Sequence, residues 1–313
     1  MTRDADLPGL PALPAPVREL FPFESKFLDL PDGNRMHYVD EGETDGEGAD
    51  AGESIVFAHG NPTWSFLYRR FIDHYRDTHR AVAMDHIGFG LSTKPTDAAY
   101  YSIETHARNF GALMDHLDLR DVTLVIQDWG GPIAMGWAIE HRERIKRLVV
   151  LDTMLGVSRV RVSLPWWFML MRKRPLGELL YGRLNLFVRS FVERMGTQRS
   201  LTEAERTAYR LPFRSAAERA GVVAFPRLIP QRPGDPTYDL LRRIEETVAE
   251  WELPALVVWA DADAGFSAEM ARQAVALLRQ ADGPHFVPAS HYLQEDAPAE
   301  IMQQIDGFLT RNP

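Results

Sequence analysis

Short apolar runs alternate with longer amphipathic stretches along most of the chain. Each short run is rich in β-branched and other apolar residues and is bounded by polar or glycine-containing segments, which is typical of a strand buried on both faces. The predicted strands are residues 36–40, 54–58, 80–84, 122–126, 147–152, 255–259 and 285–287. The longer stretches predict helices at 65–75, 102–117 and 268–278, followed by a last helix that ends at Leu309. This alternation predicts an α/β fold, with a mostly parallel sheet covered by helices on both faces.

The alternation stops between residues 155 and 244. Apolar residues in this stretch fall at helical spacing, prolines interrupt it repeatedly, and no good strand candidate occurs there. We therefore interpret 155–244 as a helical insertion in a core made of 1–154 and 245–313. Residues 1 to about 25 are rich in proline, and we expect them to form an irregular arm on the surface.

Composition excludes several classes of function. The chain has 313 residues, enough for one large core, and it contains no cysteine, so disulfides and thiolate chemistry are excluded. A formal net charge of −9 argues against a nucleic-acid surface. The N-terminus lacks the apolar core of a signal peptide, and no apolar run has the length of a membrane span, so we expect a cytoplasmic protein with no membrane partner. Composition leaves the oligomeric state open, including a homo-oligomer.

The strand at 122–126 leads into the segment Gln-Asp-Trp-Gly-Gly-Pro at 127–132. A strand, a sharp turn and a helix in direct succession have the layout of a nucleophile elbow, in which a strained turn holds one side chain above the edge of a sheet. Gly130 and Gly131 permit a close approach of helix and strand. Asp128 occupies the apex. An aspartate at such a junction can also be a helix N-cap, so this segment alone leaves both interpretations open.

Two further polar segments follow predicted strands. Residues 59–64 read His-Gly-Asn-Pro-Thr-Trp, and residues 290–296 read Ser-His-Tyr-Leu-Gln-Glu-Asp. Together with the segment at 127–131, and in this order along the chain, they resemble the haloalkane dehalogenases, within the α/β-hydrolase fold. The resemblance runs from about residue 25 to the C-terminus. It is weakest in the helical insertion, which corresponds to the cap domain of that family.

The resemblance implies a hydrolase that acts on carbon–halide bonds, with Asp128 as nucleophile and His291 as general base. A carboxylate can displace halide from an sp³ carbon and form an alkyl ester, which activated water then hydrolyses to the primary alcohol. By the same resemblance, the Trp129 indole and the Asn61 amide donate hydrogen bonds to the departing halide. The expected partners are a small apolar halogenated substrate and its halide product, with no cofactor and no metal.

A triad also needs a carboxylate that orients the histidine. Asp263 lies a few residues past the strand 255–259, where the fold usually keeps this acid, and we favour it. Asp152 ends the preceding strand, where another branch of the family keeps a glutamate, and it is the next candidate. Asp261 is either the acid or a turn residue.

An aromatic cluster opens the insertion. Trp166, Trp167 and Phe168 are candidates for lining an apolar substrate pocket, and the alternative is that they pack inside the insertion itself.

The nearest alternative function is an epoxide hydrolase, which shares the fold, the aspartate nucleophile, the histidine and the acid. That chemistry needs donors to the epoxide oxygen, and Tyr181, Tyr209 and Tyr238 of the insertion are available. The pair Asn61 and Trp129 favours the dehalogenase. A non-catalytic small-molecule binder on the same fold is a further alternative, because fold alone does not determine function.

Overall fold

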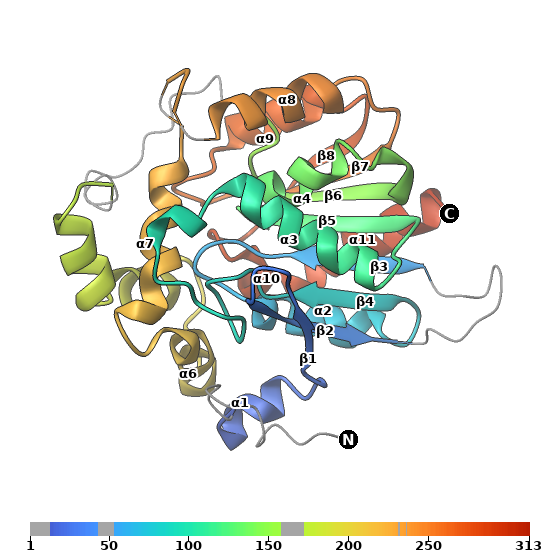
Figure 1. The fold of residues 1–313 in the computed structure, drawn as a ribbon. Helices are drawn as coiled ribbons and strands as arrows, with labels where there is room; N and C mark the ends of the chain where they lie inside the picture. Colours follow the sequence, from blue (N-terminus) through green and yellow to red (C-terminus); the bar gives the residue numbers. More distant parts are fainter. Residues whose placement is uncertain (1–12, 43–52, 158–171, 231, 236) are drawn as a thin grey trace.

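The computed structural model describes residues 13–42, 53–157, 172–230, 232–235 and 237–313, and its strands form one eight-stranded sheet. The strand order is β1-β2-β4-β3-β5-β6-β7-β8 (Figure 1). The strands are β1 (Lys26–Asp29), β2 (Arg35–Glu41), β3 (Ser54–Ala58), β4 (Arg80–Met84), β5 (Val122–Asp128), β6 (Ile145–Thr153), β7 (Pro254–Ala260) and β8 (Gln280–Val287).

Most of the sheet is parallel. All neighbouring strands from β4 to β8 run parallel, whereas β2 is antiparallel to both β1 and β4. The loops that follow the parallel strands therefore meet at one edge of the sheet, the edge at which open α/β sheets bind their ligands.

Helices cover both faces of this sheet. On one face α3 packs against α4 and α4 contacts α8, and on the other face α2 contacts α11 (Figure 1). This arrangement confirms the predicted fold class. The helices are α1 (Ala15–Leu20), η3 (Ser65–Tyr68), α2 (Arg69–Tyr75), η4 (Ala98–Tyr100), α3 (Ile103–His116), α4 (Gly130–Ala138), η5 (Arg142–Arg144), η6 (Glu178–Arg183), η7 (Val188–Met195), α6 (Glu203–Arg210), η8 (Leu211–Phe213), η9 (Ala217–Arg219), α7 (Ala220–Leu228), α8 (Tyr238–Val248), α9 (Ala268–Leu277), α10 (Leu293–Asp296) and α11 (Pro298–Arg311).

The central strands carry the apolar runs that the sequence pattern identified. Every residue of β3 and β5 is buried, as expected for strands covered on both faces. In the edge strand β8 only Val287 is buried, and the strand begins five residues before the predicted run at 285–287. Its first five residues, Gln-Ala-Asp-Gly-Pro, contain no apolar run, so the sequence pattern did not identify the start of the strand.

The described part of the chain between β6 and β7 contains helices and no strand, from η6 to α8. The elements from η6 to α7 lie beyond the carboxyl ends of the parallel strands (Figure 1), so they cover the edge of the sheet where the candidate residues are, whereas α8 contacts α4 over one face of the sheet. Trp166, Trp167 and Phe168 lie outside the described residues. Within the described residues, the helices are too short or too polar to cross a bilayer.

The N-terminal region is more regular than the expected irregular arm. Residues 15–20 form helix α1, which begins just after Pro14 and contacts α6. Residues 26–29 form strand β1, which pairs with β2 at the edge of the sheet. Proline at the start of a helix is compatible with its first turn, so a proline-rich stretch does not exclude a short helix.

Candidate active site

The sharp turn predicted after β5 is present, and Asp128 is at its apex. Asp128 is the last residue of β5 and has a φ of +49°, in the left-handed region that non-glycine residues rarely occupy. Helix α4 begins two residues later, at Gly130. A Cβ on Gly130 would lie 2.1 Å from the carbonyl oxygen of Ala58, and one on Gly131 would lie 1.9 Å from Thr153 Oγ1. The two glycines are therefore required by the close approach of α4 to β3 and β6.

The carboxylate of Asp128 has two neighbours from distant parts of the chain. The backbone N–H of Asn61, in the loop after β3, donates a hydrogen bond to Asp128 Oδ1 at 2.8 Å. His291, in the loop after β8, places its Nε2 3.6 Å from Asp128 Oδ2. The loops after three parallel strands thus converge on one carboxylate.

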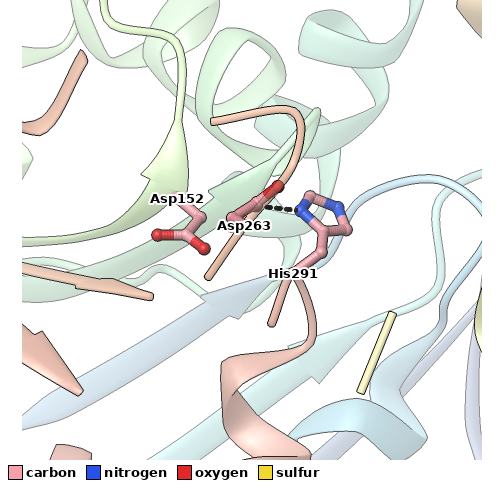
Figure 2. A group of neighbouring side chains, drawn as sticks. All are labelled: Asp152, Asp263 and His291. Carbon is pink, nitrogen blue, oxygen red and sulfur yellow. Dashed lines mark hydrogen bonds and ion pairs between the residues drawn. The ribbon is translucent and has the colours of Figure 1, made fainter. Parts of the chain in front are cut away.

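His291 is held in place on several sides. Its Nδ1 lies 2.7 Å from Asp263 Oδ2, in the loop after β7 (Figure 2). The Phe266 ring stacks on the imidazole at 5.4 Å and 11°. Gln127 donates from its side chain to the carbonyl oxygen of His291 at 3.2 Å. The histidine therefore has one ring nitrogen on a carboxylate and the other directed at Asp128, which is the geometry of a nucleophile–histidine–acid triad.

Neighbouring charges and hydrogen bonds favour the ionised forms of His291 and Asp263. Burial alone would lower the pKa of His291, but the charges of Asp263 and Asp128 and the hydrogen bonds to them raise it well above its ordinary value. Burial would also raise the pKa of Asp263. The charge of His291 and hydrogen bonds from His291 and from two backbone N–H groups instead lower it.

The three candidate acids occupy different positions. The side chain of Asp263 is buried and contacts His291 directly, whereas Asp261 is exposed and accepts a hydrogen bond from the Ala289 backbone N–H at 3.2 Å. Asp152 is fully buried beside Asp263. Asp152, Asp263 and His291 each offer one ligand-type atom, and these atoms lie within 4.8 Å of one another (Figure 2). Such a set could in principle hold a metal ion, but the short contact of His291 Nδ1 with Asp263 fits a hydrogen-bonded triad.

The two candidate halide donors lie under helix α7 of the insertion. Trp129 is 3% exposed and packs edge-to-face against Phe225 of α7, with ring centroids 5.4 Å apart. The Asn61 side-chain amide donates a long hydrogen bond of 3.5 Å to the Val222 carbonyl oxygen. Sequence reasoning did not identify Val222, Phe225 or Phe266. Val222 and Phe225 lie on α7 and Phe266 lies in the loop after β7, and an apolar residue in either place carries no local sign that it faces a site.

The three tyrosines considered as donors for an epoxide hydrolase lie in different surroundings. The Tyr209 hydroxyl donates to Glu295 Oε1 at 2.6 Å and is fully buried in a cluster of charged residues. Tyr181 contacts Phe187 within the insertion, and Tyr238 begins α8.

A nucleophile elbow on an eight-stranded, mostly parallel sheet, with a histidine and an acid from later loops, defines the class of protein. The sequence profile described as alpha/beta hydrolase fold matches residues 53–298, and the chain belongs to this family.

The relatives of this chain include enzymes named for two different reactions. A haloalkane dehalogenase from Mycolicibacterium paratuberculosis is 35% identical over 295 residues, covering 92% of this chain and 93% of that protein. A cis-3-alkyl-4-alkyloxetan-2-one decarboxylase from Shewanella oneidensis is 36% identical over 295 residues, covering 93% of this chain and 90% of that protein. The crystal structure of the haloalkane dehalogenase DatA from Agrobacterium tumefaciens superposes with a TM-score of 0.81 at 27% identity, covering 92% of this chain and 97% of that one. The resemblance to the haloalkane dehalogenases is confirmed.

Proposed function

We propose that this protein hydrolyses haloalkanes to the primary alcohol and halide through an alkyl ester on Asp128. The observation that carries the proposal is the placement of the Asp128 carboxylate, at the apex of the elbow, between the Asn61 backbone N–H at 2.8 Å and His291 Nε2 at 3.6 Å. In the first step a carboxylate oxygen attacks the carbon that bears the halogen. A C–O bond forms, the carbon–halogen bond breaks, and its electron pair leaves on the halide.

The departing halide needs donors that are already in place. The Trp129 indole N–H makes no hydrogen bond within the described residues, and the Asn61 amide N–H makes only the long contact to Val222. Because an indole is a donor only and an amide nitrogen donates two hydrogens, both groups are suited to an anion beside Asp128.

The second step hydrolyses the ester. His291 takes a proton from a water molecule whose oxygen attacks the Asp128 carboxyl carbon. The acyl C–O bond then breaks, the departing oxygen takes the proton back from the His291 imidazolium, and the alcohol leaves. Formation of the ester removes the negative charge of Asp128, one of the two charges that raise the pKa of His291. Alkylation therefore shifts His291 toward the neutral form that a general base requires, while Asp263 remains to stabilise the imidazolium that forms.

A second candidate reaction is the decarboxylation of a cis-3-alkyl-4-alkyloxetan-2-one, the activity in the name of the Shewanella oneidensis relative. The same attack by Asp128 on the ring carbon at position 4 would break the C–O bond of the lactone and leave a carboxylate. The bond between carbons 2 and 3 then breaks and releases CO₂, its electron pair forms the alkene, and Asp128 leaves as a carboxylate. This route consumes no water, so it does not need His291 as a general base.

Substrate assays distinguish the two reactions. Purified protein would be incubated with 1-bromobutane and with 1,3-dibromopropane while bromide is measured, and with an oxetan-2-one while alkene and CO₂ are measured. The control is Asp128→Asn, which keeps the shape of the side chain and removes the nucleophile. We expect bromide release by the wild type and none by this variant. Alkene without bromide would replace the dehalogenase proposal with the decarboxylase.

A trapping experiment tests the covalent step. In His291→Gln the ester should form and persist, so mass spectrometry of the protein after treatment with 1-bromobutane should show one added butyl group. Diol formation from epoxides without bromide release would favour the epoxide hydrolase. Binding of apolar ligands with no product and no adduct would favour the non-catalytic binder.

A further inference from the structure

Asp152 is a buried carboxyl group that the proposed mechanism does not use. It lies in the C-terminal part of β6, has a φ of +30°, and is fully buried (Figure 2). Its Oδ1 accepts a hydrogen bond from the Ala260 backbone N–H at 2.9 Å. Within the described residues its buried Oδ2 has no N–H or O–H donor. A buried carboxylate oxygen without a donor is costly if it carries charge.

The neighbouring carboxylate of Asp263, in contrast, has several hydrogen-bond donors. Asp263 accepts hydrogen bonds from the Gly265 backbone N–H at 2.6 Å and the Phe266 backbone N–H at 3.1 Å, and it faces His291 Nδ1 at 2.7 Å. Its carboxylate form is therefore well stabilised. Carboxylate oxygens of Asp152 and Asp263 lie within 4.8 Å of each other. Two buried carboxylates at this separation do not both ionise readily, and the proton stays on the one with fewer donors.

We propose that Asp152 is a neutral acid in the working protein and donates its carboxyl hydrogen to Asp263, as a positioning residue for the triad. Burial and the charge of Asp263 agree with this, because both raise the pKa of Asp152 well above its ordinary value. The ionisable groups that face the pair are His291 and, beyond it, Asp128 and Tyr292.

The neutral state has a consequence for the chemistry, which rests on the proposed role of His291. An ionised Asp152 would add a second negative charge beside His291 and hold it protonated, so that it could not act as a base. A neutral Asp152 adds no charge. By donating a hydrogen bond it also disperses the charge of Asp263 and fixes the orientation of that carboxylate.

Two variants separate the possible states of Asp152. Asp152→Asn keeps a neutral group with a hydrogen-bond donor, and Asp152→Leu keeps a neutral group without one. The protonation state is read without substrate, from the infrared C=O band of a protonated carboxyl group near neutral pH and from an NMR titration of the His291 ring nitrogens. Asp261→Asn is the control, because Asp261 does not contact His291.

We expect the wild type to show a protonated-carboxyl band that disappears in both Asp152 variants and persists in the Asp261 control. The His291 titration should be unchanged in Asp152→Asn and should move to higher pH in Asp152→Leu, because Asp263 loses a donor. Hydrolysis of the alkyl ester at a fixed acidic pH would then slow about tenfold in Asp152→Leu, the equivalent of one hydrogen bond to a charged group. A normal rate in Asp152→Asn would be the rescue by the conservative variant.

The contrary result is equally specific. If Asp152 is ionised, the wild type shows no such band, and Asp152→Asn moves the His291 titration to lower pH because it removes a charge. That result overturns the proposal even if the protein dehalogenates its substrates. If the band and the titrations are as expected but no substrate is turned over, the proposed function fails and the assignment of Asp152 stands.

Discussion

At the scale of single residues, the acid of the triad can be identified by comparing two aspartates of one loop. Asp263 contacts His291 Nδ1 at 2.7 Å, whereas Asp261 binds the Ala289 backbone N–H at 3.2 Å. We expect Asp263→Asn to slow hydrolysis of the alkyl ester by about 10³ to 10⁴-fold, because the imidazole loses its orientation and the partner of its charged form. Asp261→Asn should leave the rate unchanged. Single-turnover bromide release followed by mass spectrometry of the protein measures both steps, and equal effects of the two variants would argue against Asp263 as the acid.

Gly60 sets the position of the nucleophile. A Cβ at this residue would lie 2.0 Å from Asp128 Oδ1 and 2.4 Å from Asp128 Cβ, so alanine cannot be accommodated unless the carboxylate moves. We expect Gly60→Ala to lower kcat/KM about 100-fold, the effect of displacing a reacting group by about 1 Å.

The matched control for that substitution is Gly182→Ala in η6. Among the residues that the structure describes, a Cβ there would meet only Val223 Cγ2, at 3.8 Å, which is ordinary van der Waals contact. Activity assays and thermal unfolding of both variants would show whether the effect is local. Similar kcat/KM values for Gly60→Ala and the wild type would mean that Asp128 is not the nucleophile, or that it adapts to the methyl group.

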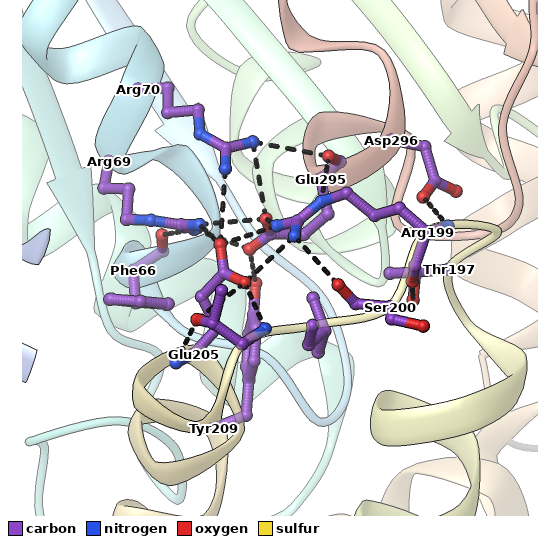
Figure 3. A network of polar contacts seen from close by, with 12 residues as sticks. Phe66, Arg69, Arg70, Thr197, Arg199, Ser200, Glu205, Tyr209, Glu295 and Asp296 are labelled. Atoms are coloured by element: carbon purple, nitrogen blue, oxygen red, sulfur yellow. Dashed lines mark hydrogen bonds and ion pairs between the residues drawn. The ribbon is translucent and has the colours of Figure 1, made fainter.

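At the scale of elements, a buried cluster of charged side chains joins the insertion to the core beside the histidine loop (Figure 3). Glu205 of α6 accepts hydrogen bonds from Arg69 of α2 at 2.8 Å and from Arg199 at 2.6 Å. Glu295 of α10 accepts from Arg69 at 2.5 and 2.9 Å. The Arg–Glu cluster consists of Arg69, Arg70, Arg199, Glu205, Tyr209 and Glu295.

Removing one charge from the Arg–Glu cluster should be costly. Glu205→Gln keeps the capping box with Thr202 in place but leaves the buried Arg69, and the partly exposed Arg70 and Arg199, with one carboxylate fewer. We expect it to lower the free energy of unfolding by about 3–5 kcal/mol, the usual cost of breaking a buried ion pair on one side. Glu203→Gln on the same helix is the control, because that side chain is 69% exposed and should have no measurable effect. Urea unfolding curves that coincide for the two variants would contradict this account.

The contribution of Glu205 depends on pH in a predictable direction. Although burial opposes ionisation, hydrogen bonds and the charges of Arg69 and Arg199 lower the pKa of Glu205 from 4.5 to about 2. A lowered pKa means that the carboxylate stabilises the fold above pH 4.5, and that this stabilisation is lost as the pH falls toward about 2. The difference in unfolding free energy between wild type and Glu205→Gln should therefore be constant near neutral pH and shrink between these values. A difference that grows on acidification would show that Glu205 is not ionised in the fold.

The sequence was sufficient for elements with a strong local pattern. Strands β3 and β4 were predicted at their observed bounds, because each contains at least four consecutive buried residues that form a clear apolar run. Strand β1 and helix α1 were missed, since each is short and owes its conformation to partners elsewhere in the chain. The partners of Asp128 could be named from motifs at strand ends. The contacts of α7 with Trp129 and Asn61 could not be predicted. Only tertiary packing decides which face of an amphipathic helix meets a site.

At the scale of the whole molecule, the candidate site lies where two parts of the chain meet. The sheet supplies Asp128 and Trp129 from the elbow after β5, and the insertion supplies Phe225 from α7. Phe225 is 1% exposed and packs against Trp129 at 5.4 Å and against Phe89 at 5.1 Å. The ring therefore contributes both to the stability of the junction and to the orientation of a candidate halide donor.

These two contributions can be separated with Phe225→Ala and Phe213→Ala. Phe213 is equally buried and lies in the same insertion, but it packs against Phe89 at 6.3 Å and not against Trp129. Each substitution should lower the free energy of unfolding by about 3–5 kcal/mol, because each removes a buried aromatic ring. Only Phe225→Ala should also lower kcat/KM for bromoalkanes, by about tenfold or more, since about 1.4 kcal/mol of lost donor orientation has that effect. Measuring unfolding and turnover on both proteins tests this, and an equal loss of activity in both would mean that the insertion supports the site through stability alone.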